Sequence, residues 1–380
     1  MKRMIAGLWS RKNYDKAGSS KDARIKALKD CVQKLALQVK QEKIEDSEIQ
    51  GILVAPEYFF TKPDPGTWDG AQFLTRAISQ AEKDQAVAEF ESVSKAFPTL
   101  LLVPGTIAWK KPLVRSASEI RKKDKLTGQR TGPLKTTSRM DKALASLQHE
   151  QTTKGEIMGG ARIAAPDLLA ALEQWVDYHY ACTTVDELDE LVMQVLHDDK
   201  KLQDVFNWSG LDKSHYTEIP ALADKMALLK TGSFIMRNTA YALLKGRVRF
   251  KYNKQGDFHE AIGDTGTVFI PGARTGIATI GGIRFGFEIC LDHNIGYLKP
   301  PVADPKDGRD IHIVTSAAVE NNDNHMFMHP GGYFLHASTN HGWTAVYHNH
   351  YQTGIAKLTP PYAADTVDGD PLEYWKIELP

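Results

Sequence analysis

The chain lacks most of the features that mark specialised classes of protein. Its three cysteines, Cys31, Cys182 and Cys290, are widely spaced, so they are too few for a disulfide framework and do not form metal-ligand pairs. No apolar run approaches the roughly 18 residues that a membrane-spanning helix needs. The basic start, Met1–Arg3, is followed by too few apolar residues for a signal peptide. We therefore expect a cytoplasmic protein with no membrane partner.

The sequence also lacks an excess of charge of either sign. Lys and Arg together number 47, Asp and Glu together also number 47, and the formal net charge is zero. A nucleic-acid partner is therefore not expected, because such a surface is normally strongly basic. The 380 residues, 42% hydrophobic and 25% charged, are enough for one large α/β core or for two domains.

Strand and helix patterns alternate over residues 1–109. Short apolar runs at Met4–Trp9, Gly51–Ala55 and Thr99–Val103 predict buried strands, and an apolar stripe through Asp22–Lys43 predicts a helix after the first of them. This alternation is typical of a parallel sheet that is covered by helices.

Residues 110–232 interrupt this pattern. Their first part is charged and rich in turn residues, and two helices are predicted within Pro166–Phe206. Strand patterns return over residues 233–380. The sequence thus predicts a sheet-containing domain formed by 1–109 and 233–380, with a mostly helical insertion at 110–232. A cover over the site is the favoured role of the insertion, and an appendage for assembly or partner binding is the alternative.

Three chemically active side chains follow predicted strands. Glu57 ends the run ILVAPE, Lys254 follows FKYN, and Cys290 ends IRFGFEIC. The carboxyl ends of parallel strands form the edge where ligands bind. There, a thiol could attack a substrate while the carboxylate accepts its proton and the ammonium stabilises the developing charge. Each residue alone has an ordinary explanation, as a solvated glutamate, an exposed lysine or a small core cysteine, so the hypothesis depends on all three.

Five segments, in this order, resemble the nitrilase superfamily of carbon–nitrogen hydrolases. They are APEYFF at Ala55–Phe60, VPGTIAW at Val103–Trp109, RNTAYALLKGRVRFKYNK at Arg237–Lys254, GIATIGGIRFGFEICLDHNIGY at Gly276–Tyr297 and RDIHIVTSAA at Arg309–Ala318. The resemblance covers most of residues 1–109 and 233–318, and leaves out the insertion and the tail.

The resemblance implies an α/β fold, a four-layer αββα sandwich, and hydrolysis of carbon–nitrogen bonds through a cysteine acyl-enzyme. The expected substrate is a small amide, nitrile or carbamoyl compound, no cofactor or metal is expected, and a homodimer stays open. A thiol poised near neutral pH is also expected at the nucleophile. Two alternatives remain: the same residues acting on a side-chain amide of a protein, and a catalytically silent binding protein on this scaffold.

Carried over residue by residue, the resemblance makes Cys290 the nucleophile, Glu57 the general base and Lys254 the residue that stabilises the tetrahedral intermediate. Glu260 is the candidate for the second glutamate that is common in the family. The backbone N–H of Leu291 is a candidate oxyanion donor, because it directly follows the nucleophile. Tyr58 is a candidate residue of the substrate pocket.

The sequence also departs from the family pattern. Where the family often has an aromatic-Pro-Glu motif after the nucleophile, this chain has His293-Asn294-Ile295, and the tail lacks the usual helical signature. These differences indicate a divergent branch.

The tail is rich in histidine, which opens a further alternative. His325 and His329 have helical spacing, and His348 and His350 have strand spacing, so a metal-dependent hydrolase is conceivable. The absence of accompanying cysteines or a matched carboxylate pattern favours ordinary loop histidines.

Overall fold

The chain separates into two compact units. The first comprises Met1–Lys110, Met236–Gly263 and Gly272–Pro380, and the second comprises Lys111–Ile235 and Asp264–Pro271. The computed structural model describes residues 1–11, 20–45, 47–60, 77–112, 165–180, 185–212, 234–256, 267–272, 275–300, 303–317 and 319–380. Glu260, Cys182 and much of the segment 110–232 lie outside these residues, so the helical insertion and the role of Glu260 stay predictions.

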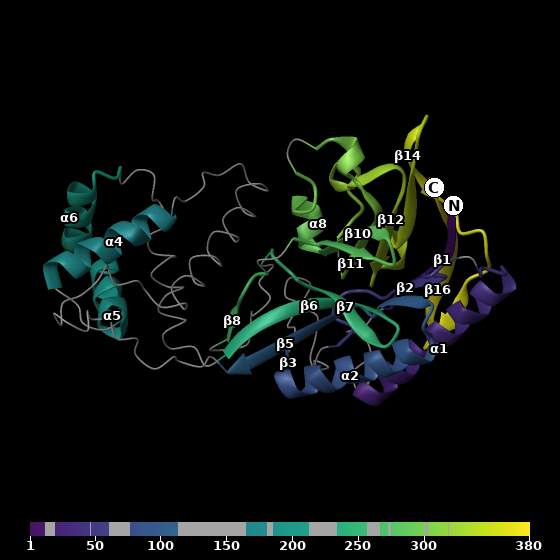
Figure 1. The fold of residues 1–380 in the computed structure, drawn as a ribbon. Helices are drawn as coiled ribbons and strands as arrows, with labels where there is room; N and C mark the ends of the chain where they lie inside the picture. Colours follow the sequence, from purple (N-terminus) through teal and green to yellow (C-terminus); the bar gives the residue numbers. More distant parts are fainter. Residues whose placement is uncertain are drawn as a thin grey trace, which may run out of the picture. The chain divides into compact units, whose positions relative to one another are not determined.

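The first unit contains two sheets (Figure 1). The first sheet has the order β15 (Asp365–Val367), β16 (Asp370–Leu379), β1 (Lys2–Trp9), β2 (Gly51–Val54), β4 (Leu100–Val103), β6 (Phe234–Leu244), β5 (Thr106–Pro112) and β3 (Ile78–Ser79), with β7 (Arg247–Asn253) also paired to β6. Its strands β1, β2 and β4 run parallel, and β16 is antiparallel to β1.

The second sheet has the order β14 (Gly354–Leu358), β13 (Ala345–His350), β12 (Met328–Ser338), β11 (Arg309–Ser316), β10 (Ile283–Ile289) and β9 (Ile277–Ile280). Its central strands β10, β11 and β12 are parallel, and the outer ones are antiparallel.

The core lies between the two sheets because alternate residues of each strand are apolar and face inward. On β10 these are Ile283, Phe285, Phe287 and Ile289, which share one buried cluster with inward residues of β1, β2 and β4. The intervening Arg284, Gly286 and Glu288 therefore face the outer side of their sheet. The two faces of β10 thus differ: one packs in the core, and the other carries the polar residues Arg284 and Glu288.

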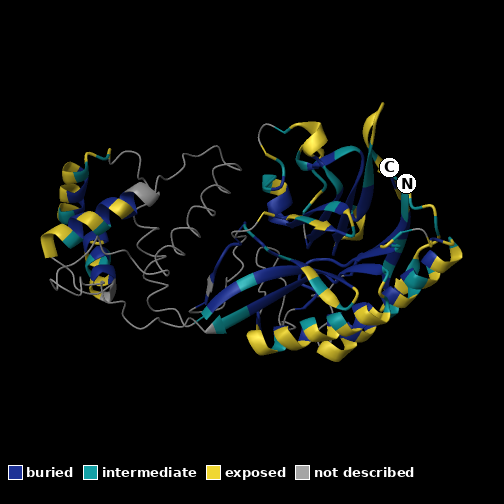
Figure 2. Cartoon of the chain, in the orientation of Figure 1, coloured by how far each residue is buried: buried dark blue, intermediate teal, exposed yellow. Residues whose placement is uncertain are grey.

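Helices cover the outer face of the first sheet. Helices α1 (Lys21–Gln41) and α2 (Gln80–Ala96) pack on it through a second apolar cluster. Ser20 and Ser79 cap their first turns, the latter in a capping box with Glu82. In Figure 2 both helices are exposed on their outer sides, whereas the central strands β2 and β4 beneath them are buried.

The outer face of the second sheet is covered by shorter elements. In the described part of the chain these are α8 (Leu291–Ile295) and the 3-10 turns η2 (Pro305–Asp307) and η3 (Asp323–His325), above the apolar cluster of Val314, Met326, Met328 and Phe334. The predicted α/β class is therefore confirmed, because two packed sheets have helices on their outer faces. In the described residues, the layer outside the second sheet consists only of these short helices and turns.

The tail is more ordered than its sequence indicates. It forms β12 to β16, so His329, His336, His348 and His350 lie on strands, and the expectation of loop histidines was wrong for these four. The strands of the tail are held by pairing with other segments of the chain: β16 pairs with β1 at the opposite end of the sequence, and β12 pairs with β11.

The described part of the second unit contains α4 (Ala165–Tyr180), α5 (Val185–Leu196), α6 (Asp199–Ser209) and the strand β8 (Thr267–Phe269). The sequence pattern predicted two helices within Pro166–Phe206, whereas the structure has three. The third begins because the Asp198 side chain accepts hydrogen bonds from the backbone N–H groups of Lys200 and Lys201. Among all described helices, none has the length and apolar character of a membrane span.

Gly105 fixes the turn between β4 and β5 against the segment that carries Glu57. Its φ is +76°, and a Cβ at this position would lie 2.2 Å from the carbonyl oxygen of Pro56 and 2.9 Å from Cβ of Phe59. Only glycine combines this conformation with so close an approach.

We predict that Gly105→Ala lowers the free energy of unfolding by at least about 3 kcal/mol, because the clash with backbone adds to the strain of the left-handed conformation. Gly354→Ala is the control, since Gly354 has a φ of +75° but no atom within 4 Å of its added Cβ. It should cost only about 1 kcal/mol. Urea unfolding measures both, and equal costs would show that the contact with Pro56 is not tight.

Candidate active site

The structure brings Glu57, Lys254 and Cys290 together. Lys254 directly follows β7, Cys290 directly follows β10, and Glu57 lies three residues beyond β2. Lys254 Nζ donates to Glu57 Oε1 over 2.8 Å, and the side chains of this ion pair are 1% and 0% exposed. Cys290 is also buried, and its thiol forms a hydrogen bond with the Glu57 side chain. A carboxylate, an ammonium and a thiol thus share one buried site.

Two further groups hold the Glu57 carboxylate. Asn238 Nδ2 donates to Oε1 over 2.8 Å, and the backbone N–H of Ala317 donates to Oε2 over 3.1 Å. The backbone carbonyl oxygen of Asn238 also accepts a hydrogen bond from the backbone N–H of Lys254. The sequence reasoning missed Asn238 and Ala317. Asn238 could have been found as a polar residue on the inward side of β6, between Met236 and Ala240.

Cys290 occupies a strained turn. Its φ is +51° and its ψ is −107°, which is unfavourable for a residue with a side chain, and its backbone N–H donates to the Thr315 carbonyl oxygen over 2.9 Å. Strain of this kind persists only where surrounding contacts impose the conformation. The thiol on this turn is within hydrogen-bonding contact of the Glu57 side chain.

The electrostatics of Cys290 differ from the sequence expectation of a poised thiol. Burial and the nearby Glu57 charge raise the pKa of Cys290, and Lys254 and the Ala317 N–H only partly oppose this. The resting thiol is therefore protonated at neutral pH. A nucleophilic role would therefore need a proton acceptor in contact with the sulfur.

Asp292 joins the Cys290 turn to the loop that carries Lys254. Its carboxyl group accepts the Tyr252 hydroxyl over 2.8 Å and the backbone N–H groups of Gln255 and Gly256 over 3.1 Å and 2.6 Å. Burial raises the pKa of Asp292 to about 7, although the Gly256 N–H and the Lys254 charge oppose the shift. The group therefore changes charge near neutral pH.

Two further predicted residues, Tyr58 and Leu291, have clear positions, and their roles stay predictions. Tyr58 is buried with a φ of +55°, and its ring centroid lies 5.7 Å from Lys254 Nζ. It packs in a small apolar cluster with Ala77, Ala108, Met236 and Ala317. Leu291 is the first residue of α8 and directly follows Cys290. Glu260 lies outside the described residues.

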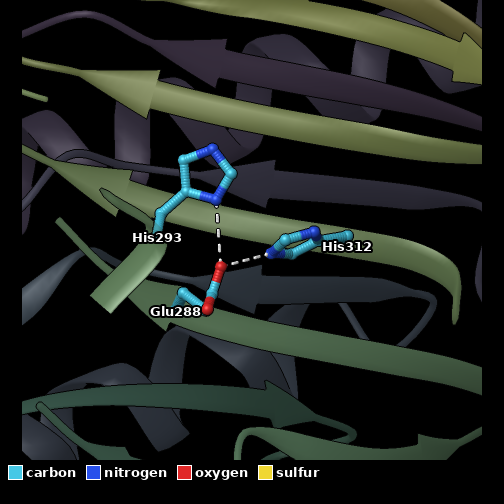
Figure 3. Close-up of side chains that lie close together, drawn as sticks. All are labelled: Glu288, His293 and His312. Carbon is cyan, nitrogen blue, oxygen red and sulfur yellow. Dashed lines mark hydrogen bonds and ion pairs between the residues drawn. The ribbon is translucent and has the colours of Figure 1, made fainter. Parts of the chain in front are cut away.

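A second polar cluster, formed by Glu288, His293 and His312, begins on the outer face of β10 two residues before Cys290 (Figure 3). Glu288 Oε2 is 3.0 Å from His293 Nδ1 and 2.9 Å from His312 Nε2, and Oε1 accepts the backbone N–H of Leu298 over 2.8 Å. Burial opposes ionisation, but the hydrogen bonds from the two histidines lower the pKa of Glu288 to about 2. The carboxylate is therefore charged at neutral pH.

Glutamate and two histidines are metal-ligand types, yet the hydrogen bonds of this cluster do not fit a metal. The backbone N–H of Asn322 donates to His293 Nε2, and that of Phe327 donates to His312 Nδ1. Both of these nitrogens must be acceptors, so the nitrogens that face Glu288 carry the protons. A metal would need lone pairs on those same nitrogens. The cluster is a hydrogen-bonded carboxylate.

The tail histidines that raised the metal hypothesis also have other partners. His325 Nδ1 contacts the His293 carbonyl oxygen over 2.8 Å, and His329 Nε2 pairs with Asp310 over 2.8 Å. His348 and His350 contact each other on β13. Within the described residues, the Glu288 cluster is the one group of three potential ligands close enough for a single ion.

We predict that Asp292→Asn becomes relatively more stable than the unchanged protein as pH rises. The folded-state pKa is raised, so the unfolded chain ionises first between about pH 4 and pH 7, and the unchanged protein loses stability over that range. The difference should grow by roughly 2–4 kcal/mol, at about 1.4 kcal/mol for each pH unit.

Urea unfolding at several pH values from 4.5 to 7.5 measures this difference. Asp365→Asn is the control, because hydrogen bonds from Tyr374 and Lys34 lower the pKa of Asp365 despite its partial burial, so this carboxylate is ionised over the whole range. Its effect on stability should not vary with pH. A constant difference for Asp292→Asn would mean that Asp292 is ionised in the folded protein.

The comparisons with known proteins give structures but no sequence match. No family model and no curated protein matches this sequence. The chain is similar to Saccharomyces cerevisiae Nit3, a member of branch 10 of the nitrilase superfamily, at 12% identity over 99% of this chain and 90% of that one, with a TM-score of 0.40. It is similar to a mutant of the Nesterenkonia amidase of the same superfamily at 10% identity over 100% and 92% of the chains, with a TM-score of 0.41.

A carbon–nitrogen hydrolase from Helicobacter pylori is also similar, at 10% identity over 98% of this chain and 88% of that one, with a TM-score of 0.40.

Proposed function

We propose that the chain is a carbon–nitrogen bond hydrolase that acts on a small amide, nitrile or carbamoyl compound through an acyl-enzyme on Cys290. The observation that carries the proposal is the buried ion pair of Glu57 and Lys254 in contact with a thiol on a strained turn. Burying two charges is costly, and active sites are where such costs are most often found.

In the proposed first step, the sulfur of Cys290 attacks the carbonyl carbon of an amide. The thiol proton passes to Glu57 as the carbon–sulfur bond forms, because the raised pKa of the thiol prevents its ionisation beforehand. The carbonyl electron pair moves to oxygen. Lys254 stabilises this oxyanion, and the Leu291 N–H is the proposed second donor.

The intermediate then collapses and breaks the carbon–nitrogen bond. Glu57 returns its proton to the departing nitrogen, and a thioester remains on Cys290. Water next attacks the thioester carbon and gives a proton to Glu57. The carbon–sulfur bond breaks, the acid leaves, and Glu57 restores the thiol proton. The same carboxylate thus serves both half-reactions, which requires the fixed orientation that Asn238 and Ala317 provide.

The acyl-enzyme can be observed directly. We expect intact-protein mass spectrometry, after incubation with a panel of amides, nitriles, carbamoyl compounds and a glutamine-containing peptide, to find an adduct on Cys290 with the mass of the acyl portion. The adduct should be absent from Cys290→Ala. Adducts from the peptide alone would favour a protein side-chain amide as the substrate. Turnover that persists in Cys290→Ala would contradict the proposal.

The three residues should also behave as one unit. Cys290→Ala, Glu57→Gln and Lys254→Met should each lower kcat at least about 10³-fold, and the triple variant should cost little more than one replacement, because covalent catalysis fails once any member is missing. Lys245→Met is the matched control, since Lys245 pairs with Glu48 over 2.7 Å at an exposed position. It should leave kcat unchanged. An active Glu57→Gln enzyme would require a different base.

A further inference from the structure

The turn that carries Cys290 has little support of its own. Helix α8 has only five residues, and Cys290 at its N-cap makes no side-chain capping hydrogen bond. So short a helix is not stable by itself, and the left-handed Cys290 adds strain. Contacts from outside the helix must therefore hold the nucleophile in place.

Glu288 supplies such contacts on the outer face of the second sheet. It lies two residues before Cys290, and its carboxylate binds the chain at two points beyond it: His293 within α8 and the backbone N–H of Leu298 after α8. His312 on β11 fixes the same carboxylate from the neighbouring strand. The backbone thus leaves β10 at Cys290 and is tied back to Glu288 on β10 at two points, within α8 at His293 (Figure 3) and after α8 at Leu298.

We propose that Glu288, His293 and His312 form a positioning clamp that sets the direction of the Cys290 thiol toward Glu57. This inference rests on the proposed function of Cys290. None of the three residues touches the substrate in this proposal, so they are positioning residues. Apolar side chains could fill the same space without the cost of burying a charge, which favours a role in orientation over one in packing.

The directions of the hydrogen bonds make the clamp specific. Three N–H groups converge on one carboxylate, and each imidazole is held in a single tautomer by a backbone N–H on its far side. Glutamine at position 288 would present its own N–H₂ group to one of these donors. If a histidine changed tautomer to accept this N–H₂ group, its other ring nitrogen would carry a proton. That proton would then face the backbone N–H of Asn322 or Phe327. Glu288→Gln therefore disrupts the clamp while preserving its shape.

The test compares three variants: Glu288→Gln, the apolar triple variant Glu288→Met/His293→Phe/His312→Phe, and Asp310→Asn as the matched control. Asp310 pairs with Arg284 on β10 and with His329 on β12, so its loss also removes an acid–histidine contact, near the start of β10 instead of at its Cys290 end. The probe is p-nitrophenyl acetate, whose carbonyl carbon the Cys290 sulfur attacks as p-nitrophenolate leaves and Glu57 accepts the thiol proton.

We expect Glu288→Gln and the triple variant to lower the rate of Cys290 acetylation at least about tenfold, with KM within about threefold, because small misplacements of a nucleophile cost much of the rate. Asp310→Asn should acetylate at the original rate.

The free energy of unfolding should separate the variants differently. It should fall in Glu288→Gln and recover in the triple variant, where no polar group is left unpaired. A triple variant with the original acetylation rate would overturn the clamp. If it does not fold, Glu288→Gln decides at a temperature where circular dichroism shows it folded.

Hydrogen exchange tests the clamp independently of the proposed function, because it measures how firmly α8 is held and not whether Cys290 reacts. Amides in the peptide that spans 290–298 should exchange at least about tenfold faster in Glu288→Gln and at the original rate in Asp310→Asn. Unchanged exchange in Glu288→Gln would overturn the clamp whatever the activity. If Cys290 of the unchanged protein is not acetylated at all, the proposed function fails, while the exchange result still decides whether Glu288 holds α8.

Discussion

The buried ion pair between Glu57 and Lys254 is the interaction on which the rest of the site depends. Removing water from two charges is costly, and the cost is offset only when each charge has well-placed partners. Glu57 therefore needs Asn238 and the Ala317 N–H in addition to Lys254. These donors come from β6, from the loop after β7 and from the end of β11, so the pair fixes three separate parts of the unit around one carboxylate.

Three buried carboxyl groups lie around Cys290, and each binds a different part of the chain. Glu57 contacts the thiol itself, Asp292 holds the loop of Lys254, and Glu288 holds the far side of α8. Their environments give them different proton affinities. Burial raises the pKa of Asp292 to about 7, whereas two imidazole donors outweigh burial and lower the pKa of Glu288 to about 2. Similar groups in one region can thus carry different charges, because hydrogen-bond donors and not burial alone decide the outcome.

The protonated thiol explains why Glu57 must touch Cys290 in the proposed mechanism. A thiolate beside a carboxylate in a buried site would place two negative charges together, with Lys254 as their shared counter-ion. Keeping the proton on sulfur until attack avoids this repulsion. Lys254 then has one negative charge to balance at each stage, first on Glu57 and later on the proposed oxyanion.

The sequence alone determined the α/β class and the strand ends at Glu57, Lys254 and Cys290, because apolar runs of strand length are local signals and the residues that follow them lie at the sheet edge. The roles proposed for these residues come from the family resemblance. Only the tertiary structure decided the partners of these residues. Asn238 reaches Glu57 across 181 positions, and β16 pairs with β1 from the far end of the chain. The direction of the Cys290 pKa shift likewise follows from burial and from the distance to two charges, and neither quantity is encoded in any local stretch of sequence.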